Sequence, residues 1–314
     1  MSKKTGYLIG ILLTIIIGMI LNWFFCCRSA TGDTSTETQN DANDNLEITK
    51  PNTNPTSLGF DLKDPNGSFA FNSADNFDFN TSKFDIIRPL SNQVDLGIDT
   101  LQLYLSQNEH ANKHIDITGY YTSTESNPSA FPNLGIARAT AVKNYLVSKG
   151  IASKRLNTLG SLKDDLTPDG TIYHGPVSYR MYDVSPDDDT ENKTLEALKA
   201  RINADPLVLY FGNAQASITL SPAQRQKIAD ITHYLDKVDG SSIRIVGHTD
   251  NTGNREANVR LGQKRADFAK NYFATNGIPA SKINTTSKGP DAPIATNNTE
   301  EGRSKNRRSV VSLN

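Results

Sequence analysis

The chain has 314 residues, a formal net charge of −1 and two cysteines. This length allows two globular domains and additional segments, because compact domains usually have roughly 100–200 residues. The near-neutral charge, with Lys and Arg spread along the chain, excludes a basic field of the kind that binds nucleic acid. Cys26 and Cys27 are adjacent and cannot join distant parts of a folded domain, so hydrophobic cores must stabilise the domains.

A long apolar stretch lies near the N-terminus. Tyr7 to Phe25 is an uncharged, Ile- and Leu-rich run of 19 residues, which is about enough helix to cross a ~30 Å hydrocarbon core. Lys3 and Lys4 precede it, so the positive-inside tendency keeps residues 1–6 in the cytoplasm and exports the rest of the chain. We therefore expect residues 7–25 to form a transmembrane helix in the lipid bilayer.

Two alternatives to an uncleaved anchor stay open. A signal peptide cut near Ala30 usually has only ~7–15 apolar residues before small residues at the cleavage site, whereas this run is longer and ends in Trp23, Phe24 and Phe25. Lipidation at Cys26 would require small residues where the two phenylalanines stand. An uncleaved helix predicts an inner-membrane protein with its domains in the periplasm, and the alternatives allow association with the outer membrane.

Residues 28–57 differ in composition from the apolar stretch. They are rich in Thr, Asn, Asp and Ser and contain almost no apolar residues, so they cannot bury enough surface to offset the entropy lost on ordering. A chain of about 30 such residues has an r.m.s. span of ~30 Å and a maximum reach of ~100 Å. We expect a flexible tether that lets the following domains search for a target away from the membrane.

Periodic patterns of apolar residues follow the tether. In residues 58–184 they predict a strand at Asn76–Phe79, a helix from about Pro89 to Gln107, a strand at Ile115–Thr118 and a helix from about Asn133 to Lys149. Residues 185–204 form a connecting segment. Its first part, Ser185–Asp189, is a linker, and an amphipathic helix from Glu191 to Asn203 leads into the second half.

Residues 205–314 show a clearer succession of elements. Predicted in chain order are a strand at Leu207–Phe211, a helix that opens at Ser221-Pro222 and ends near Lys237, a strand at Ile243–Thr249, a helix from Asn254 to Thr275, and extended segments near Asn284–Lys288 and Arg308–Leu313. This β-α-β-α-β-β order calls for helices packed on a mixed sheet, so the predicted fold class is α+β.

The two halves repeat one pattern. Five pairs of short motifs match at a constant offset of 127 residues: Leu134-Gly135 with Leu261-Gly262, Arg138-Ala139 with Arg265-Ala266, Asn144-Tyr145 with Asn271-Tyr272, Gly150-Ile151 with Gly277-Ile278, and Asn157-Thr158 with Asn284-Thr285. A constant offset over five motifs indicates a duplicated domain. We call residues 58–184 the first copy and residues 205–314 the second copy.

Asp250 and Arg265 are the candidate functional pair of the second copy. Asp250 lies where a predicted strand ends and a Gly-containing loop begins, a usual place for function on a rigid scaffold. Arg265 shares one stripe of the following helix with Asn258 and Leu261. A carboxylate and a guanidinium on neighbouring elements, without a nucleophile or metal-ligand motif beside them in the sequence, indicate recognition of a zwitterion. The alternative is an internal salt bridge that holds the helix to the sheet.

An ordered set of motifs runs through the second copy. It consists of Gly247-His-Thr-Asp250, Gly253, Asn258, Leu261, Arg265-Ala266, Gly277-Ile278, Pro293-Ile294-Ala295, Asn298 and the run from Glu301 to Arg308. With these motifs the second copy resembles the C-terminal domain of the OmpA family over nearly all of residues 205–314. It departs from that family at Gly262, where Ser is common, at a cost in helix propensity but without loss of a ligand group.

The resemblance implies a domain that binds peptidoglycan through the diaminopimelate of its stem peptides. It implies that Asp250 takes the ammonium and Arg265 the carboxylate of diaminopimelate, while Asn258 assists and the backbone amides of residues 251–253 cradle the peptide. For the Asn-Arg-Arg ending, ligand contact and packing of the last strand are both open. The ligand-binding candidates are therefore Asp250, Arg265, Asn258, Asn251, Thr252, Gly253, Arg307 and Arg308.

The first copy has the same order of elements but a different residue at the position of the candidate acid. Gly119-Tyr-Tyr-Thr122 stands where the second copy has Gly247-His-Thr-Asp250, so Thr122 replaces the aspartate, whereas Arg138 remains. An arginine without its acidic partner can take a carboxylate but binds an ammonium poorly. We expect a diverged copy without wall binding, used as a spacer, as a dimerisation surface or for docking another envelope protein.

No enzymatic activity, metal or cofactor is expected. The sequence has no Cys–His pairing, no zinc-ligand spacing and no second acid in a motif beside Asp250, and His248 is expected to be a positioned residue at the end of the sheet. A motor stator would need an acid inside Tyr7–Phe25, which has none. Two functions remain: a membrane-anchored wall tether, and a scaffold subunit of a secretion or motility machine that uses wall binding as its anchor.

Overall fold

The computed structural model describes residues 54–185, 189–212 and 218–314. The membrane helix predicted at residues 7–25 and nearly all of the predicted tether lie outside these ranges. Within them, no helix has both the length and the apolar character needed to span a bilayer.

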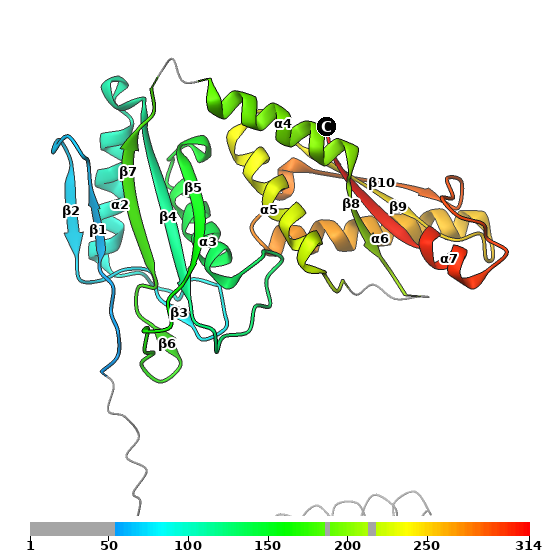
Figure 1. Cartoon of the computed structure of the whole chain (residues 1–314), viewed down its shortest axis with the longest axis horizontal. Helices are drawn as coiled ribbons and strands as arrows, with labels where there is room; N and C mark the ends of the chain where they lie inside the picture. The colour runs from blue at the N-terminus through cyan, green and yellow to red at the C-terminus, as the bar shows by residue number, and fades with distance from the viewer. Residues whose placement is uncertain (1–53, 186–188, 213–217) are drawn as a thin grey trace, which may run out of the picture. The chain divides into compact units, whose positions relative to one another are not determined.

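A four-stranded mixed sheet forms the centre of the second copy (Figure 1). Its strands are β8 (Leu207–Tyr210), β9 (Ile243–His248), β10 (Ile283–Gly289) and β11 (Arg308–Leu313), in the order β10-β9-β11-β8. β10 pairs parallel with β9, and β11 pairs antiparallel with both β9 and β8. The predicted mixed sheet and the order of its elements are confirmed.

The helices of the second copy begin where the sequence predicts. They are α5 (Pro222–Lys237), α6 (Arg255–Thr275) and the short α7 (Glu300–Asn306), which was not predicted. Ser221 and Gln224 form a capping box at the start of α5, and the Asn254 side chain caps α6. Both patterns satisfy backbone N–H groups that a helix start leaves unpaired. Apolar side chains of α5 and α6 lie in one buried cluster with those of the sheet.

The first copy repeats the central part of this frame. It has the helices α2 (Asn92–Leu105) and α3 (Leu134–Ser148) and the strands β4 (Lys113–Tyr121), β5 (Leu156–Leu162) and β7 (Val177–Asp183). β4 pairs parallel with β5 and antiparallel with β7. The order β5-β4-β7 therefore corresponds to β10-β9-β11 of the second copy.

The strand predicted at Asn76–Phe79 is largely wrong. Only Phe79–Asn80 is extended (β3), and it pairs with β6 (Ile172–Tyr173), apart from the three-stranded sheet. The Asn76 side chain donates hydrogen bonds to the carbonyls of Leu58, Gly59 and Val177. These bonds hold the segment in an irregular conformation instead of a strand.

A hairpin that was not predicted packs against β7 instead. Its strands are β1 (Phe60–Lys63) and β2 (Ala70–Ser73). The ring of Phe60 lies 4.3 Å from that of Tyr179 in β7, measured between centroids. The remaining short elements are 3-10 turns at Asn108–His110, Ser153–Arg155 and Ala280–Lys282.

The predicted amphipathic helix between the copies is present as α4 (Thr190–Ala204). Its buried residues Leu195, Leu198 and Ile202 belong to the hydrophobic cluster of the second copy. Phe131 of the first copy lies in the same cluster, and Lys143, almost fully buried, forms an ion pair with Asp236 of α5. The two copies therefore share one apolar cluster.

Backbone contact between a helix and a strand recurs in both copies. A Cβ atom added to Gly247 of β9 would lie 1.9 Å from the carbonyl oxygen of Gly262 in α6. In the first copy, a Cβ atom on Gly119 would lie 2.1 Å from the carbonyl oxygen of Gly135. Gly247 and Gly119 are therefore packing residues. At Gly262 an added Cβ atom would lie 2.3 Å from Ser287 Oγ and 3.0 Å from the Gly247 carbonyl oxygen.

We expect Gly247→Ala to lower the free energy of unfolding by about 1–3 kcal/mol, because the new methyl group meets backbone that cannot turn away. Gly262→Ala should cost less, since its nearest atom is the Ser287 Oγ at 2.3 Å, a rotatable side chain, and Ala favours the helix. Urea unfolding of the two variants measures the difference. Equal losses would contradict the backbone contact as the limiting constraint.

Candidate functional site

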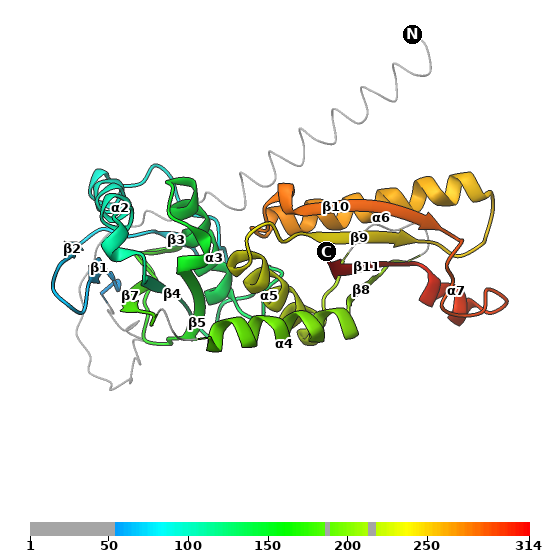
Figure 2. The same ribbon diagram turned by 90° about the horizontal axis from the view of Figure 1, so that it is seen from above.

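One end of the second sheet brings together three segments that are distant in the sequence. The C-terminal end of β9, the N-terminal end of α6 and the short helix α7 lie at the same end (Figure 2). Asp250 follows β9 by two residues, and Arg307 lies between α7 and β11. This arrangement places Asp250 and Arg307 within hydrogen-bonding distance.

Asp250 is a buried, oriented carboxylate. Its Oδ1 accepts a hydrogen bond from the Thr252 amide at 3.0 Å, and its Oδ2 accepts one from Arg307 Nη1 at 2.9 Å. Burial alone would raise the pKa of Asp250, but these hydrogen bonds outweigh it and hold the pKa below the ordinary 3.8. Asp250 is therefore ionised at neutral pH.

Arg307 lies between two carboxylates. Its Nη2 donates to Glu300 Oε1 at 2.7 Å, and Glu300 also accepts a hydrogen bond from Arg303. Burial works against the charged guanidinium, yet Asp250 and Glu300 together raise the pKa of Arg307. Glu300 was not predicted as a site residue, because it lies 50 positions from Asp250 in the sequence and belongs to no motif with it.

Arg265 is almost completely buried, with 1% of its surface exposed. Its Nη1 donates to the His248 carbonyl at 3.2 Å and its Nη2 to the Gly212 carbonyl at 3.3 Å, while the guanidinium lies over the Phe211 ring. Within the described ranges its Nε has no hydrogen-bond partner and no acid pairs with it. Burial lowers the pKa of Arg265, Asp250 opposes this effect and Arg307 adds to it. Arg265 is thus a buried cation with donor capacity left for an anion.

The alternative of an internal Asp250–Arg265 salt bridge is wrong. Asp250 pairs with Arg307 at 2.9 Å, and among the described residues no ion pair joins Asp250 to Arg265. The two groups nevertheless interact electrostatically. Asp250 and Arg265 are thus electrostatically coupled but not ion-paired with each other.

The other predicted site residues divide into loop residues and supports. Asn251, Thr252 and Gly253 are exposed on the loop after β9, and Gly253 has a φ of +88°, which suits glycine. Asn258 is buried and donates to the Thr252 carbonyl at 2.9 Å. Asn258 therefore holds the loop in place.

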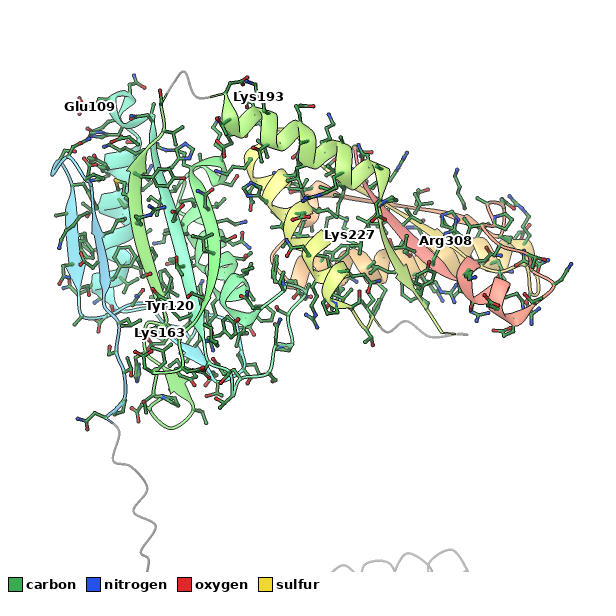
Figure 3. The ribbon with its side chains drawn as sticks, viewed as in Figure 1. Glu109, Tyr120, Lys163, Lys193, Lys227 and Arg308 are labelled. Carbon is green, nitrogen blue, oxygen red and sulfur yellow. The ribbon has the colours of Figure 1, made fainter. Side chains whose placement is uncertain are left out.

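The partners of Arg308 are backbone carbonyls. Its guanidinium donates to the carbonyls of Ala292 and Asn306, and Figure 3 labels it at the start of β11. Asn306 in turn bonds to the amides of Ile294 and Ala295. In the described structure, these two residues of the Asn-Arg-Arg ending hold the preceding loop, whereas Arg307 contacts the acid.

His248 is neutral at physiological pH. Burial, together with the positive charges of Arg308 and Lys288, lowers its pKa to about 4. In the described part of the chain its Nδ1 has no hydrogen-bond partner. The expected role of a positioned residue at the end of the sheet stays a prediction.

In the first copy, one expectation about the arginine is wrong. Arg138 does have an acidic partner, because Glu125 forms an ion pair with it and both side chains are fully buried. Glu125 was not predicted, although Thr122-Ser-Thr-Glu125 has the S/T-x-x-E spacing that often marks a side chain bonding back to the backbone. Nearby, Lys163 lies over the ring of Tyr120 (Figure 3).

Two copies of one mixed-sheet frame, the second with an oriented acid near a buried arginine, define a duplicated α+β domain. The OmpA family matches residues 76–172 and again residues 210–307. These two segments make up more than half of the chain, so the protein belongs to the OmpA family.

Individual relatives match a part of the chain. It is 37% identical over 115 residues to the probable lipoprotein YiaD of Escherichia coli (strain K12), covering 35% of this chain and 52% of the relative. It is 36% identical over 124 residues to the peptidoglycan-associated lipoprotein of Buchnera aphidicola, covering 40% and 68%. The crystal structure of the peptidoglycan-associated lipoprotein from Burkholderia pseudomallei is 26% identical with a TM-score of 0.31, covering 34% and 89%. The chain thus spans about half the length of YiaD.

We expect the His248 ring to titrate near pH 4 in an NMR titration of the folded chain. His174 provides an internal control, because its hydrogen bond to Asp78 raises its pKa above 6.5. Since the unfolded chain binds the His248 proton at about pH 6.5, stability should fall as pH drops from about 6.5 to about 4. The variant His248→Gln should lose this part of the acid sensitivity. A His248 midpoint above 6 would contradict the assigned burial and neighbouring charges.

Proposed function

We propose that the second copy binds peptidoglycan non-covalently and recognises the zwitterionic end of diaminopimelate in its stem peptides. The observation that carries this proposal is Arg265, a buried guanidinium without an anionic partner among the described residues, close to the ionised Asp250. Membership of the OmpA family and similarity to proteins named peptidoglycan-associated lipoproteins support it.

Each end of the ligand has a matching group. The carboxylate of diaminopimelate would take the donors that Arg265 has left, in a charge-assisted and directional contact. Its ammonium would approach Asp250, which already accepts hydrogen bonds from Thr252 and Arg307. The exposed loop of residues 251–253 would lie along the peptide, with Asn258 holding it in position.

The ammonium and Arg307 would compete for the same carboxylate. Glu300 offers Arg307 a second acid at 2.7 Å, so Arg307 can release Asp250 without being left unpaired. A buried charge that loses its only partner is costly. Glu300 would therefore support ligand binding by keeping the displaced guanidinium paired with an acid.

For the whole chain we propose a non-enzymatic tether between a membrane and the cell wall. The apolar stretch at residues 7–25 would anchor it, most simply in the inner membrane with both copies in the periplasm, and the polar segment at residues 28–57 would supply reach. The alternative, a scaffold subunit of a secretion or motility machine, uses the same site. Affinity capture from intact envelopes separates the two, because only a scaffold retains stoichiometric protein partners.

Asp250→Ala and Arg265→Ala should each weaken binding of the full chain to peptidoglycan by ~5- to 150-fold, because removal of one partner leaves a ligand group unpaired at ~1–3 kcal/mol. Co-sedimentation with purified wall measures this loss. Arg260→Ala is the matched control, since Arg260 is exposed on the same helix. Undiminished binding by both folded site variants would refute the assigned pair.

The double variant Asp250→Ala/Arg265→Ala should retain no saturable wall binding, because the arginine of the first copy is already paired with Glu125. Thr122→Asp, which restores only the missing acid, should add no binding site. Titration with a soluble diaminopimelate-containing stem peptide gives the number of sites per chain. A stoichiometry of two in the unmodified chain would show that the first copy binds as well.

A further inference from the structure

The arginines of the two copies sit in matching frames. Arg138 Nη1 donates to the Tyr120 carbonyl at 2.8 Å, as Arg265 Nη1 does to the His248 carbonyl. Arg138 Nη2 lies 3.4 Å from the Asn80 carbonyl, and Arg265 Nη2 lies 3.3 Å from the Gly212 carbonyl.

The aromatic neighbours of the two arginines match as well. Each guanidinium carbon is 5.4 Å from the centre of a phenylalanine ring, Phe79 in the first copy and Phe211 in the second. These shared contacts hold both guanidinium groups at the same end of their sheets.

The copies differ most in one carboxylate. Arg138 Nε also donates to the Lys83 carbonyl at 3.1 Å, and its guanidinium carbon lies 5.4 Å from the centre of the Tyr173 ring, whereas Arg265 Nε has no partner among the described residues. Glu125 Oε1 accepts hydrogen bonds from Arg138 Nη2 at 2.6 Å and from the Ser82 amide at 2.9 Å. Glu125 Oε2 accepts them from Arg138 Nη1 at 3.2 Å and from the Thr122 amide at 3.0 Å. Each oxygen thus has one guanidinium donor and one backbone donor, so four donors surround the carboxylate as they would surround a bound anion.

The loop that carries Glu125 replaces helix. In the second copy, α6 begins at Arg255, six residues before Leu261, whereas in the first copy α3 begins at Leu134, the counterpart of Leu261. The segment from Ser123 to Asn133 is therefore irregular where the second copy has a short loop followed by helix. This change brings an acid of the same chain to the arginine.

We propose that the first copy retains a carboxylate-binding site and that Glu125 of the same chain occupies it as a permanent internal ligand. The carboxylate fills all the described donors around it, so an external anion finds no free place. The first copy is then a closed form of the binding domain. This geometry does not depend on what the second copy binds.

The proposal predicts that truncating the internal ligand opens the site. Glu125→Ala in the full chain removes one methylene and the carboxylate, which together correspond to acetate. Because Arg138 is left buried and unpaired, the melting temperature should fall by roughly 5–15 °C. Sodium acetate should recover part of this loss in a saturable manner, since a ligand of the folded state stabilises it. Sodium chloride at equal ionic strength should not.

The double variant Glu125→Ala/Arg138→Met is the matched control. It has the same cavity without the buried cation, so acetate and chloride should affect it equally. Pivalate, which carries the same charge on a bulkier group, should recover less than acetate in Glu125→Ala. If Glu125→Ala is unfolded in chloride, recovery of its folded circular dichroism signal in acetate is the same measurement.

Two results would overturn the proposal. One is an equal response of Glu125→Ala to acetate and chloride, whether that variant is folded or unfolded. The other is an acetate response of the same size in the double variant. Wall binding by the second copy plays no part in either readout, so a failure here is distinguishable from a failure of the proposed function.

Discussion

The backbone contact between a helix and the central strand fixes the position of the arginine in each copy. Gly262 meets Gly247, and three residues further along the helix Arg265 bonds to the carbonyl of the residue after Gly247. Gly135, Gly119 and Arg138 repeat these spacings. A side chain on either strand glycine would push the helix away and withdraw the guanidinium from the sheet end. The site in the second copy therefore depends on the contact between Gly247 and Gly262, two residues without a side chain that could bind a ligand.

A guanidinium buried in this way is more stable with an anion beside it. Burial of an uncompensated charge is unfavourable, and backbone carbonyls and a phenylalanine ring compensate it only in part. In the first copy this anion is the carboxylate of Glu125, fully buried against Arg138. In the second copy we propose that it is the carboxylate of the ligand. The two copies thus share the arginine and the order of the three strands around it, although among the described residues the first sheet has no counterpart of β8. At the arginine they differ in the loop that carries Glu125, which makes the first copy the closed form.

Much of the second copy could be predicted from sequence because its signals are local. Ser221-Pro222 and Asn254 mark helix starts through hydrogen bonds within a few residues, and apolar periodicity identified the strands. Asp250 and Arg265 were identified from their places at a strand end and on the next helix together with the family motifs, although their function in binding stays a prediction. Arg307 was a site candidate, but its ion pairs with Asp250 and Glu300 were not predicted, because only the folded sheet brings these three residues together.

The first copy was harder to predict for the same reason. Its β1 and β2 strands have four residues each, too few for a periodic pattern, and they are stabilised by contact with β7. Glu125 lies in a Ser-, Asn- and Pro-containing loop that is typical of an exposed turn, yet tertiary contacts bury its side chain. The residues around Glu125 in the sequence do not indicate that its side chain will pair with the buried Arg138.

The position of Arg307 between Asp250 and Glu300 has a consequence for selectivity. Because Asp250 is already paired with a guanidinium, an inorganic cation would have to displace Arg307 to reach the carboxylate. In the proposed binding mode an ammonium would displace Arg307 from Asp250, while Arg307 keeps the contact that it already has with Glu300. Such a displacement would gain little by itself, so the ligand carboxylate at Arg265 would have to supply most of the net binding free energy. Neither half of the zwitterion would then suffice alone, and the site would behave as a coincidence detector for the two charges of its ligand.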